Sequence, residues 1–248
     1  MRAWVLSVLV AGALVAACGQ SEDVADEEVL VSAASSLTGA FTEMEAAFEA
    51  SHPGFDVVLN FGGSSLLREQ ILGGAPVDVF ASASTEIMGE VAAAGRLTGD
   101  AEVFALNRVQ IAVPAGNPGE VMGLASFGER GLLIGLCAEG VPCGDLGRRA
   151  LEMAGVEPSI DTEEPNARSL LVKLEAGELD AGITYETDVI ASELVEGLEM
   201  PEDVDVVAEY SIAALGNGSH TVGAAELVSY VLSAEGRAIL VDHGFVVP

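Results

Sequence analysis

Positive charge is scarce in this sequence, and lysine is almost absent from it. Lys173 is the only lysine, and Lys and Arg together number 10 against 39 Asp and Glu, so the 248-residue chain has a net charge of −29. Nucleic-acid binders owe their affinity to clustered cations that contact phosphates, so we do not expect a nucleic-acid-binding function. Half of the residues are nonetheless apolar, which indicates a folded protein with an acidic, solvated surface rather than a disordered chain.

Long hydrophobic runs are absent beyond the first residues. Arg2 precedes an uncharged stretch, Ala3 to Ala17, which is followed by Cys18. At 15 residues this stretch is shorter than the roughly 20 needed to span a bilayer, and small residues occupy the position where a signal peptidase cuts. We therefore expect a signal peptide over residues 1–17 and export of the remaining chain.

The end of this stretch, Val15-Ala16-Ala17-Cys18, resembles a bacterial lipobox, in which the cysteine is acylated and becomes the mature N-terminus. The resemblance implies lipidation of Cys18, which would anchor the protein to the cell membrane, facing the periplasm or the extracellular side, since two or more acyl chains anchor a protein stably. Residues 18–28 would form an acidic tether. A plain signal peptide with an incidental cysteine is the alternative.

Cysteine is rare in the rest of the chain, where only Cys137 and Cys143 occur, six positions apart. In an exported protein such a pair is more often bridged than free, so we predict a disulfide between them. A zinc site is not expected, because it would need more ligands. The histidines are scattered without ligand spacing, at His52, His220 and His243.

Short β-branched runs alternate with helical patterns along the chain. Several runs are almost wholly apolar, as in strands that helices cover on both faces of a parallel sheet. The pattern predicts an α/β fold, and the length allows one large domain or two modest ones. Strands are expected at residues 28–32, 55–61, 77–81, 109–113, 132–136, 181–185 and 204–207, and left-handed glycine C-caps at Gly73-Gly74, Gly95, Gly155 and Gly177.

Four of the expected strand-to-helix turns carry small or polar residues. Helix N-termini offer unpaired N–H groups and a partial positive charge, so several that converge would bind an anion without a formal cation. Ser and Asn are also common N-caps, and periodicity does not show that the turns converge. The turns are Ser35-Ser36, Gly62-Gly63-Ser64-Ser65, Val141-Pro142-Cys143-Gly144 and Glu164-Pro165-Asn166-Ala167.

These segments resemble, in order along the chain, the motifs of the periplasmic molybdate-binding proteins of ABC importers. The similarity covers residues 29–245, and its most specific part is the block from Gly74 to Ala83 together with the upstream Ser35-Ser36-Leu37-Thr38 and Gly62-Gly63-Ser64. The later segments that match are Asn107-Arg108, Val113 to Pro118, Val141 to Gly144 and Gly182 to Asp188.

The resemblance implies a type II periplasmic binding protein fold, in which two α/β lobes with mixed, mostly parallel sheets are joined by a hinge of two chain crossings. The crossings would lie near residues 107–109 and 208–210. One lobe would then comprise residues 29–108 with 210–248, and the other residues 109–209. We expect a monomer, without catalytic activity or cofactor, that passes its ligand to an ABC permease in the membrane.

By motif position, the resemblance implies five oxyanion ligands: Ser36, Ser64, Cys143, Ala167 and Tyr185. The two serines would bind through hydroxyl and backbone N–H groups, Cys143 and Ala167 through backbone N–H groups, and Tyr185 through its phenol. Relatives often carry Ala where this chain has Cys143, and Val where it has Ala167. Both contacts would be made by the main chain, so these substitutions need not abolish binding. Ser35 and Ser65 are adjacent hydroxyls that could replace their neighbours.

These donors suit a fully ionised tetrahedral dianion, such as molybdate, tungstate or sulfate. Phosphate keeps a proton and favours a site with an acceptor, which none of the five residues supplies. A choice of molybdate over sulfate would depend on cavity size, because a smaller anion leaves buried donors unpaired. A protein that binds sulfate or another tetrahedral oxyanion is therefore the main alternative, and molybdate and tungstate are too alike to separate.

Other classes fit the sequence less well. An α/β-hydrolase would need Gly-x-Ser-x-Gly with a downstream Asp and His, and the segment Gly62 to Ser65 lacks the final glycine. Iron-binding proteins of the same fold usually use paired tyrosines, whereas Tyr185, Tyr210 and Tyr230 are not adjacent. A lipid-anchored interaction module with a degenerate pocket would show no thermal stabilisation by the anion.

Two arginines lie just inside the helices that follow the second and fourth turns, at Arg68 and Arg168. A cation there could clamp an anion. In so acidic a chain, however, we expect both side chains to pair with carboxylates.

Overall fold

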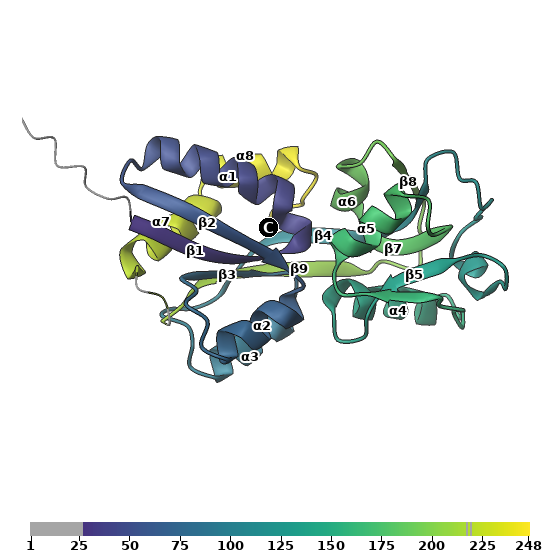
Figure 1. Cartoon of the computed structure of the whole chain (residues 1–248), viewed down its shortest axis with the longest axis horizontal. Helices are drawn as coiled ribbons and strands as arrows, with labels where there is room; N and C mark the ends of the chain where they lie inside the picture. Colours follow the sequence, from purple (N-terminus) through teal and green to yellow (C-terminus); the bar gives the residue numbers. More distant parts are fainter. Residues whose placement is uncertain (1–26, 217, 219) are drawn as a thin grey trace, which may run out of the picture.

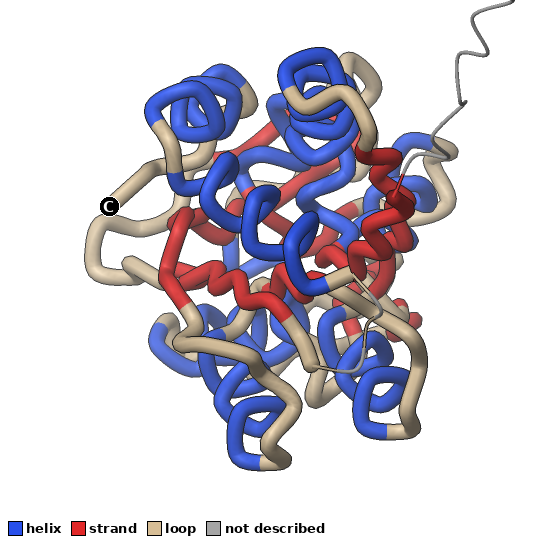
Figure 2. Tube along the Cα trace, turned by 90° about the vertical axis from the view of Figure 1, so that its left-hand side faces the viewer, coloured by secondary structure: helices blue, strands red, loops and turns tan. Residues whose placement is uncertain are grey.

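The structure is a computed structural model that describes residues 27–216, 218 and 220–248. The expected signal peptide, Cys18 and most of the expected tether lie outside these residues. Figure 1 shows two lobes side by side, with two long strands running between them. In the end-on view of Figure 2 helices lie above and below the strands, so the α/β class predicted from the sequence is confirmed.

The first lobe has a parallel core. Strand β1 (Glu27–Ala34) lies between β2 (Phe55–Gly62) and β3 (Val79–Ser82) and pairs with both in parallel. Helices cover this sheet, and Phe48 of α1 (Thr38–Ser51) packs edge-on against Tyr230 of α7 (Thr221–Leu232) at 5.6 Å between ring centroids. The helices of this lobe are α1 (Thr38–Ser51), α2 (Ser64–Leu72), α3 (Thr85–Ala93), α7 (Thr221–Leu232) and α8 (Ala234–Asp242), with the short 3-10 helix η1 (Ser35–Leu37) before α1.

The second lobe repeats this plan. Strand β5 (Ile134–Cys137) pairs in parallel with β6 (Thr162–Glu164) and β7 (Ala181–Tyr185). Its other strand is β8 (Val195–Leu198), and its helices are η2 (Leu124–Gly128), α4 (Pro142–Met153), α5 (Ala167–Glu175) and α6 (Glu186–Ile190). Every residue of β5 and β7 is buried, as expected for strands covered by helices on both faces.

Two antiparallel strands connect the lobes, β4 (Glu102–Pro114) and β9 (Val207–Ala214). β4 pairs with β9 as far as Arg108 and with β7 from Val109 onward, so it leaves one lobe and enters the other within a single strand. β9 in turn pairs with β3. The strand order is β2-β1-β3-β9-β4-β7-β5-β6, with β8 paired to β4, which places the connecting strands in the middle and β2 and β6 at the two ends.

Several predicted boundaries are corrected by the structure. β1 begins at Glu27, so the last two residues of the expected tether belong to the sheet. The strand expected at 204–207 is instead Val207–Ala214, because Val204 and Val206 are buried ahead of the strand rather than within it. β4 extends from Glu102, well before the expected residue 109.

The glycine C-caps agree with the sequence in all but one case. Gly74, Gly95, Gly155 and Gly177 have positive φ angles, whereas Gly73 is right-handed at φ −71° and Gly74 supplies the turn. Within the described ranges no helix combines the length and apolar character needed to cross a bilayer.

Candidate functional site

A small pocket lies between the two lobes, with an empty volume of about 190 Å³. The turns after β1 and β2 line it from the first lobe, and the starts of α4 and α5 with the end of β7 line it from the second. All five residues predicted as oxyanion ligands are among its lining residues. The full set is Ala34, Ser35, Ser36, Gly62, Gly63, Ser64, Ala83, Val141, Pro142, Cys143, Asn166, Ala167 and Tyr185.

Helices α2, α4 and α5 begin at this pocket. The first N–H groups of a helix have no partner inside it and carry the positive end of its dipole. At α5 the Asn166 side chain accepts from Ser169 N at 2.9 Å, and at α4 Val141 O accepts from Gly144 N and Asp145 N. No group in the described chain caps Cys143 N or Ala167 N, so both are available to a ligand.

The Ser64 hydroxyl is held as a hydrogen-bond donor toward the pocket. Ser64 is buried, and its Oγ accepts a hydrogen bond from Ala83 N at 3.0 Å. Because that bond uses a lone pair, the hydroxyl proton remains free to donate to another partner.

The Ser36 hydroxyl is held through the strands that connect the lobes. Its Oγ lies 2.7 Å from the phenol Oη of Tyr210 in β9. Asn107 Nδ2 in β4 lies 3.5 Å from the same phenol and donates to Thr187 Oγ1 at 2.7 Å. If Asn107 donates to the Tyr210 phenol, the phenol can in turn donate to Ser36 Oγ. The hydroxyl proton of Ser36 is then left to donate to a further acceptor.

Tyr185 at the end of β7 presents an unused hydroxyl. The residue is 1% exposed, and its Oη has no bond with hydrogen-bonding geometry to any group in the described chain. The nearest aromatic neighbour is Tyr210, edge-on at 5.9 Å between ring centroids. Burial, followed by the influence of Tyr210 and Asp188, raises the pKa of the Tyr185 phenol well above its ordinary value. The phenol is therefore neutral and can donate.

The two neighbouring serines behave differently from each other. Ser35 lines the pocket, and its carbonyl accepts from Thr38 Oγ1 at 2.6 Å. Ser65 is not among the lining residues, because its hydroxyl donates to Gly140 O of the opposite lobe. The pocket lining thus includes the predicted ligand Ser64 and not its neighbour Ser65.

A disulfide joins Cys137 at the end of β5 to Cys143 in the first turn of α4, with 5.7 Å between the Cα atoms. Arg148 supports the same turn, since its Nη1 donates to Cys137 O at 2.8 Å and to Gly144 O at 3.2 Å. A Cβ on Gly144 would overlap Ala138 O. The start of α4, and with it Cys143 N, is fixed by covalent and polar contacts together.

The two arginines pair with carboxylates, as predicted. Arg68 contacts Glu69 and, at 2.8 Å, Glu90. Arg168 lies 3.5 Å from Glu175 and lines a neighbouring groove, which shares Ser35 and Ser36 with the pocket, rather than the pocket itself. Neither side chain lines the pocket, so neither is placed to bind an anion there.

The pocket offers hydrogen-bond donors without formal charge, since none of the described residues that line it is acidic or basic. Two buried carboxylates close to it are held by other groups. Glu164 accepts from the only lysine, Lys173, at 2.5 Å, and Asp188 accepts from Thr184 Oγ1 at 2.7 Å and from Tyr185 N at 3.3 Å. Such a donor set stabilises an acceptor-only anion.

Asp188 has an altered pKa. Burial raises the pKa of its carboxyl from 3.8 to about 6, and the hydrogen bonds from Thr184 and Tyr185, together with Arg168, oppose that rise. This carboxyl supports the Tyr185 backbone at the base of α6 and does not line the pocket.

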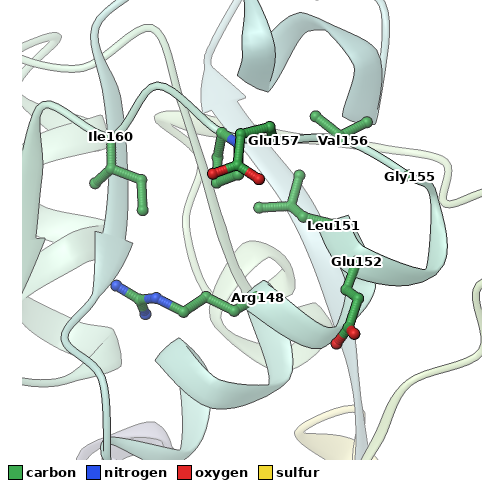
Figure 3. A pocket seen from close by; sticks show the side chains of 8 residues that line it. Arg148, Leu151, Glu152, Gly155, Val156, Glu157 and Ile160 are labelled. Carbon is green, nitrogen blue, oxygen red and sulfur yellow. The ribbon is translucent and has the colours of Figure 1, made fainter.

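A larger hollow lies elsewhere, on the second lobe. It has an empty volume of about 1080 Å³ and lies between α4 and the segment that follows it (Figure 3). Arg148, Glu152 and Glu157 line it, but the Arg148 guanidinium is already bonded to Cys137 O, Gly144 O and Glu163. This hollow does not offer a set of free donors.

Sequence reasoning missed the residues that orient the hydroxyls. Tyr210, Asn107 and Ala83 contact the site from β9, β4 and the end of β3. Asn107 and Tyr210 were expected only at the chain crossings, and nothing in their local pattern indicates a partner on η1. No group of three or more His, Cys, Asp or Glu within the described ranges could hold a metal ion.

Comparisons with known proteins agree with this geometry. Residues 29–246 match the family described as bacterial extracellular solute-binding protein. The chain is 37% identical to the molybdate-binding protein ModA of Mycobacterium tuberculosis, over 98% of this chain and 96% of that protein.

Solved structures show the same fold. The periplasmic molybdate-binding protein of Azotobacter vinelandii superposes with a TM-score of 0.78 at 20% identity, covering 89% of this chain and 99% of that one. The sulfate-binding protein SubI of Mycobacterium tuberculosis superposes with a TM-score of 0.75 at 16% identity, covering 88% of this chain and 86% of that one.

Proposed function

The chain belongs to the family of bacterial extracellular solute-binding proteins, and from that premise we propose that it binds molybdate, or the closely similar tungstate, and delivers it to an ABC permease. Five residues would hold the oxyanion: Ser36, Ser64, Cys143, Ala167 and Tyr185. The 37% identity to a molybdate-binding protein over almost the whole chain supports this ligand.

The observation that carries the proposal is the meeting of donors from both lobes in one pocket without a carboxylate among its described lining residues. Ser64 Oγ accepts a hydrogen bond from Ala83 N, Ser36 Oγ lies 2.7 Å from Tyr210 Oη, and Tyr185 Oη has no hydrogen-bond partner among the described residues. A fully ionised tetrahedral anion can accept from all of them at once. Donors that are already oriented within each lobe bind charge strongly, because once the lobes have closed they need little further rearrangement.

Sulfate is the second candidate, since a sulfate-binding protein shares the fold. It is also a fully ionised tetrahedral dianion, but it is smaller, so in a pocket sized for molybdate some buried donors would lose their acceptor. Each such loss costs about 1–3 kcal/mol. Phosphate ranks lower, because its proton favours a carboxylate acceptor and none of the described residues that line the pocket is acidic.

The two lobes would close on the anion by bending at β4 and β9. In this proposal one lobe comprises residues 29–108 with 210–248 and the other residues 109–209. A monomer would suffice, since both lobes that line the pocket come from one chain. Closure would produce the surface that the permease recognises.

Attachment to the membrane is the remaining part of the proposal. Residues 1–17 would be removed as a signal peptide and Cys18 acylated, and the acidic segment that follows would separate the fold from the membrane. Mass spectrometry of the protein from a bacterial membrane fraction tests this step, and an unmodified N-terminal residue other than Cys18 would contradict it.

Calorimetric titration of residues 21–248 with molybdate, tungstate, sulfate and phosphate tests the ligand. We expect one-to-one binding of molybdate and tungstate, with much weaker binding of sulfate and none of phosphate. Sulfate binding as tight as molybdate would instead identify a general oxyanion receptor. Absence of a binding heat with all four anions would contradict the proposed function.

A further inference from the structure

The pocket is closed on the side away from the connecting strands by direct contacts between the lobes. β2 and β6 are the end strands of the sheet order, farthest from β9 and β4. The turn after β2 reaches the segments that follow β5 and β6, and these contacts involve Gly63, Ser65, Gly140 and Pro165. We call them the mouth contacts.

The first mouth contact is a hydrogen bond from the hydroxyl of Ser65 to the carbonyl oxygen of Gly140. Ser65 belongs to the first turn of α2, and Gly140 belongs to the loop before α4. This bond exists only when the lobes meet, since its two partners are on opposite sides of the connecting strands.

The second mouth contact explains why residue 63 is glycine. Gly63 has φ −65° and ψ 134°, a conformation that any residue adopts, so its own backbone does not require glycine. A Cβ at this position would lie 2.5 Å from Pro165 O and 3.5 Å from Asn166 Cβ. The constraint on residue 63 therefore comes from the opposite lobe, and an alanine would fit its own lobe but not the closed pocket.

We propose that Gly63 and Ser65 control lobe closure: Gly63 permits the final approach of the lobes and Ser65 holds them together once the anion is bound. The inference rests on the proposed function, because Ser64, a proposed ligand, lies between these two residues. A single turn thus contacts the anion and the opposite lobe, which couples binding to closure. Both are positioning residues, because neither needs to touch the anion.

A distance measurement across the lobes tests this role directly. Spin labels at Glu86→Cys in α3 and Glu152→Cys in α4 lie one on each lobe at exposed positions, and pulsed electron resonance gives their distance distribution. With molybdate, we expect the short-distance population to dominate in the otherwise native protein and to be absent in Gly63→Ala. Gly99→Ala is the matched control, because a Cβ there meets nothing within 4 Å and φ is not positive.

Affinity and dissociation rates provide the second readout. Gly63→Ala should weaken molybdate binding by more than about tenfold, because the closed state that binds tightly becomes inaccessible. Ser65→Ala should weaken it roughly 3- to 10-fold, mainly through faster dissociation, the effect of one lost hydrogen bond. Ser51→Ala is its control, since Ser51 Oγ donates to Ala47 O within one helix, and it should bind like the native protein.

The possible results separate the two proposals. If the Gly63→Ala variant shows the same interlobe distances and the same molybdate affinity as the native protein, the inference is overturned and the proposed function is left intact. A native protein that binds none of the anions would contradict the proposed function, and the inference, which rests on it, would fail with it.

Discussion

At the scale of single residues, the site depends on hydroxyl groups whose protons are directed by their neighbours. Ser64 accepts from Ala83 N and Ser36 pairs with Tyr210, while Tyr185 Oη has no hydrogen-bond partner within the described part of the chain. Serine and tyrosine hydroxyls both donate and accept, so they become selective for an anion only when the accepting side is occupied. The residues that direct the protons are therefore as important as the proposed ligands.

The first prediction concerns Tyr185→Phe, which removes only the unpartnered Oη. We expect molybdate affinity to fall roughly 10- to 100-fold, the loss of one hydrogen bond to a charged group. The melting temperature without ligand should change little, because the Oη has no partner with hydrogen-bonding geometry among the described residues. Calorimetry and thermal denaturation measure the two effects.

Tyr230→Phe is the matched control for this change. It removes the same atom from a buried tyrosine that packs against Phe48 in the first lobe, and it should leave anion affinity unchanged. An unaltered affinity in Tyr185→Phe would remove Tyr185 from the ligand set.

The sequence predicted the residues whose role is local and missed those whose role is not. Ser36 and Ser64 were predicted because each lies in a strand-to-helix turn that resembles a family motif, and both line the pocket. Tyr210 is 174 positions from Ser36, and no local pattern connects them. The sequence also left Ser65 as an alternative to Ser64, because the two hydroxyls are adjacent and only the opposite lobe distinguishes them.

At the scale of secondary-structure elements, the starts of helices carry the site. The first turn of α4 is held by the Cys137–Cys143 disulfide and by Arg148. Because Cys143 N is a proposed donor, the disulfide would preorganise it. The short closed loop would also stabilise the fold by roughly 2–3 kcal/mol in the chain-entropy account.

The second prediction follows from this support. In the double variant Cys137→Ala with Cys143→Ala, which keeps the backbone N–H, we expect tungstate affinity to fall several-fold and the urea midpoint to decrease. The native protein after reduction should show the same change in affinity. Unchanged affinity in both would show that the disulfide stabilises the lobe without organising the site.

The third prediction concerns Asp188 at the start of α6. Burial raises the pKa of Asp188 from 3.8 to about 6, so between these values the folded protein binds more protons than the unfolded one. The stabilising contribution is therefore fully present below pH 3.8 and is lost as pH rises toward 6 and above. Its size is on the order of 1–3 kcal/mol.

Asp188→Asn should remove this pH dependence while keeping an acceptor for Thr184 and Tyr185 N. The free energy of unfolding of the native protein relative to the variant, measured with urea at several pH values, should fall between pH 4 and pH 7. A difference in unfolding free energy that stays constant across this range would contradict the raised pKa of the buried Asp188 carboxyl.

Prediction of the elements succeeded where burial gives a clear pattern. β7 was predicted at its observed bounds, because all of its residues are buried. The short strands β6 and β8 were not predicted, since Thr162–Glu164 is polar and Val195–Leu198 has exposed central residues. Pairing with a neighbouring strand defines both, and that information lies outside the segment.

At the scale of the whole molecule, charge and lobe arrangement act on binding in different ways. The chain has a net charge of −29, whereas the described residues that line the pocket carry no charged side chain. Long-range repulsion therefore acts on an approaching dianion, while short-range donors act on the bound one. Salt screens the first effect beyond about 8 Å at physiological ionic strength and leaves the second largely intact.

The fourth prediction is that salt accelerates association. The association rate constant for molybdate should rise as sodium chloride increases from low to physiological concentration, with little change in the dissociation rate. Stopped-flow tyrosine fluorescence can follow it, because Tyr185 and Tyr210 lie at the site. An association rate that falls with salt would indicate local attraction by cations, and Arg168 in the neighbouring groove would then be the first candidate.

The central claim is that five donors from two lobes hold one oxyanion in the pocket. A crystal structure of residues 21–248 with tungstate tests it most directly, because the anomalous signal of tungsten locates the anion independently of the protein. We predict a single site with tungstate oxygens within hydrogen-bond distance of Ser36 Oγ, Ser64 Oγ, Cys143 N, Ala167 N and Tyr185 Oη. Tungsten bound elsewhere, with this pocket holding only water, would contradict the account.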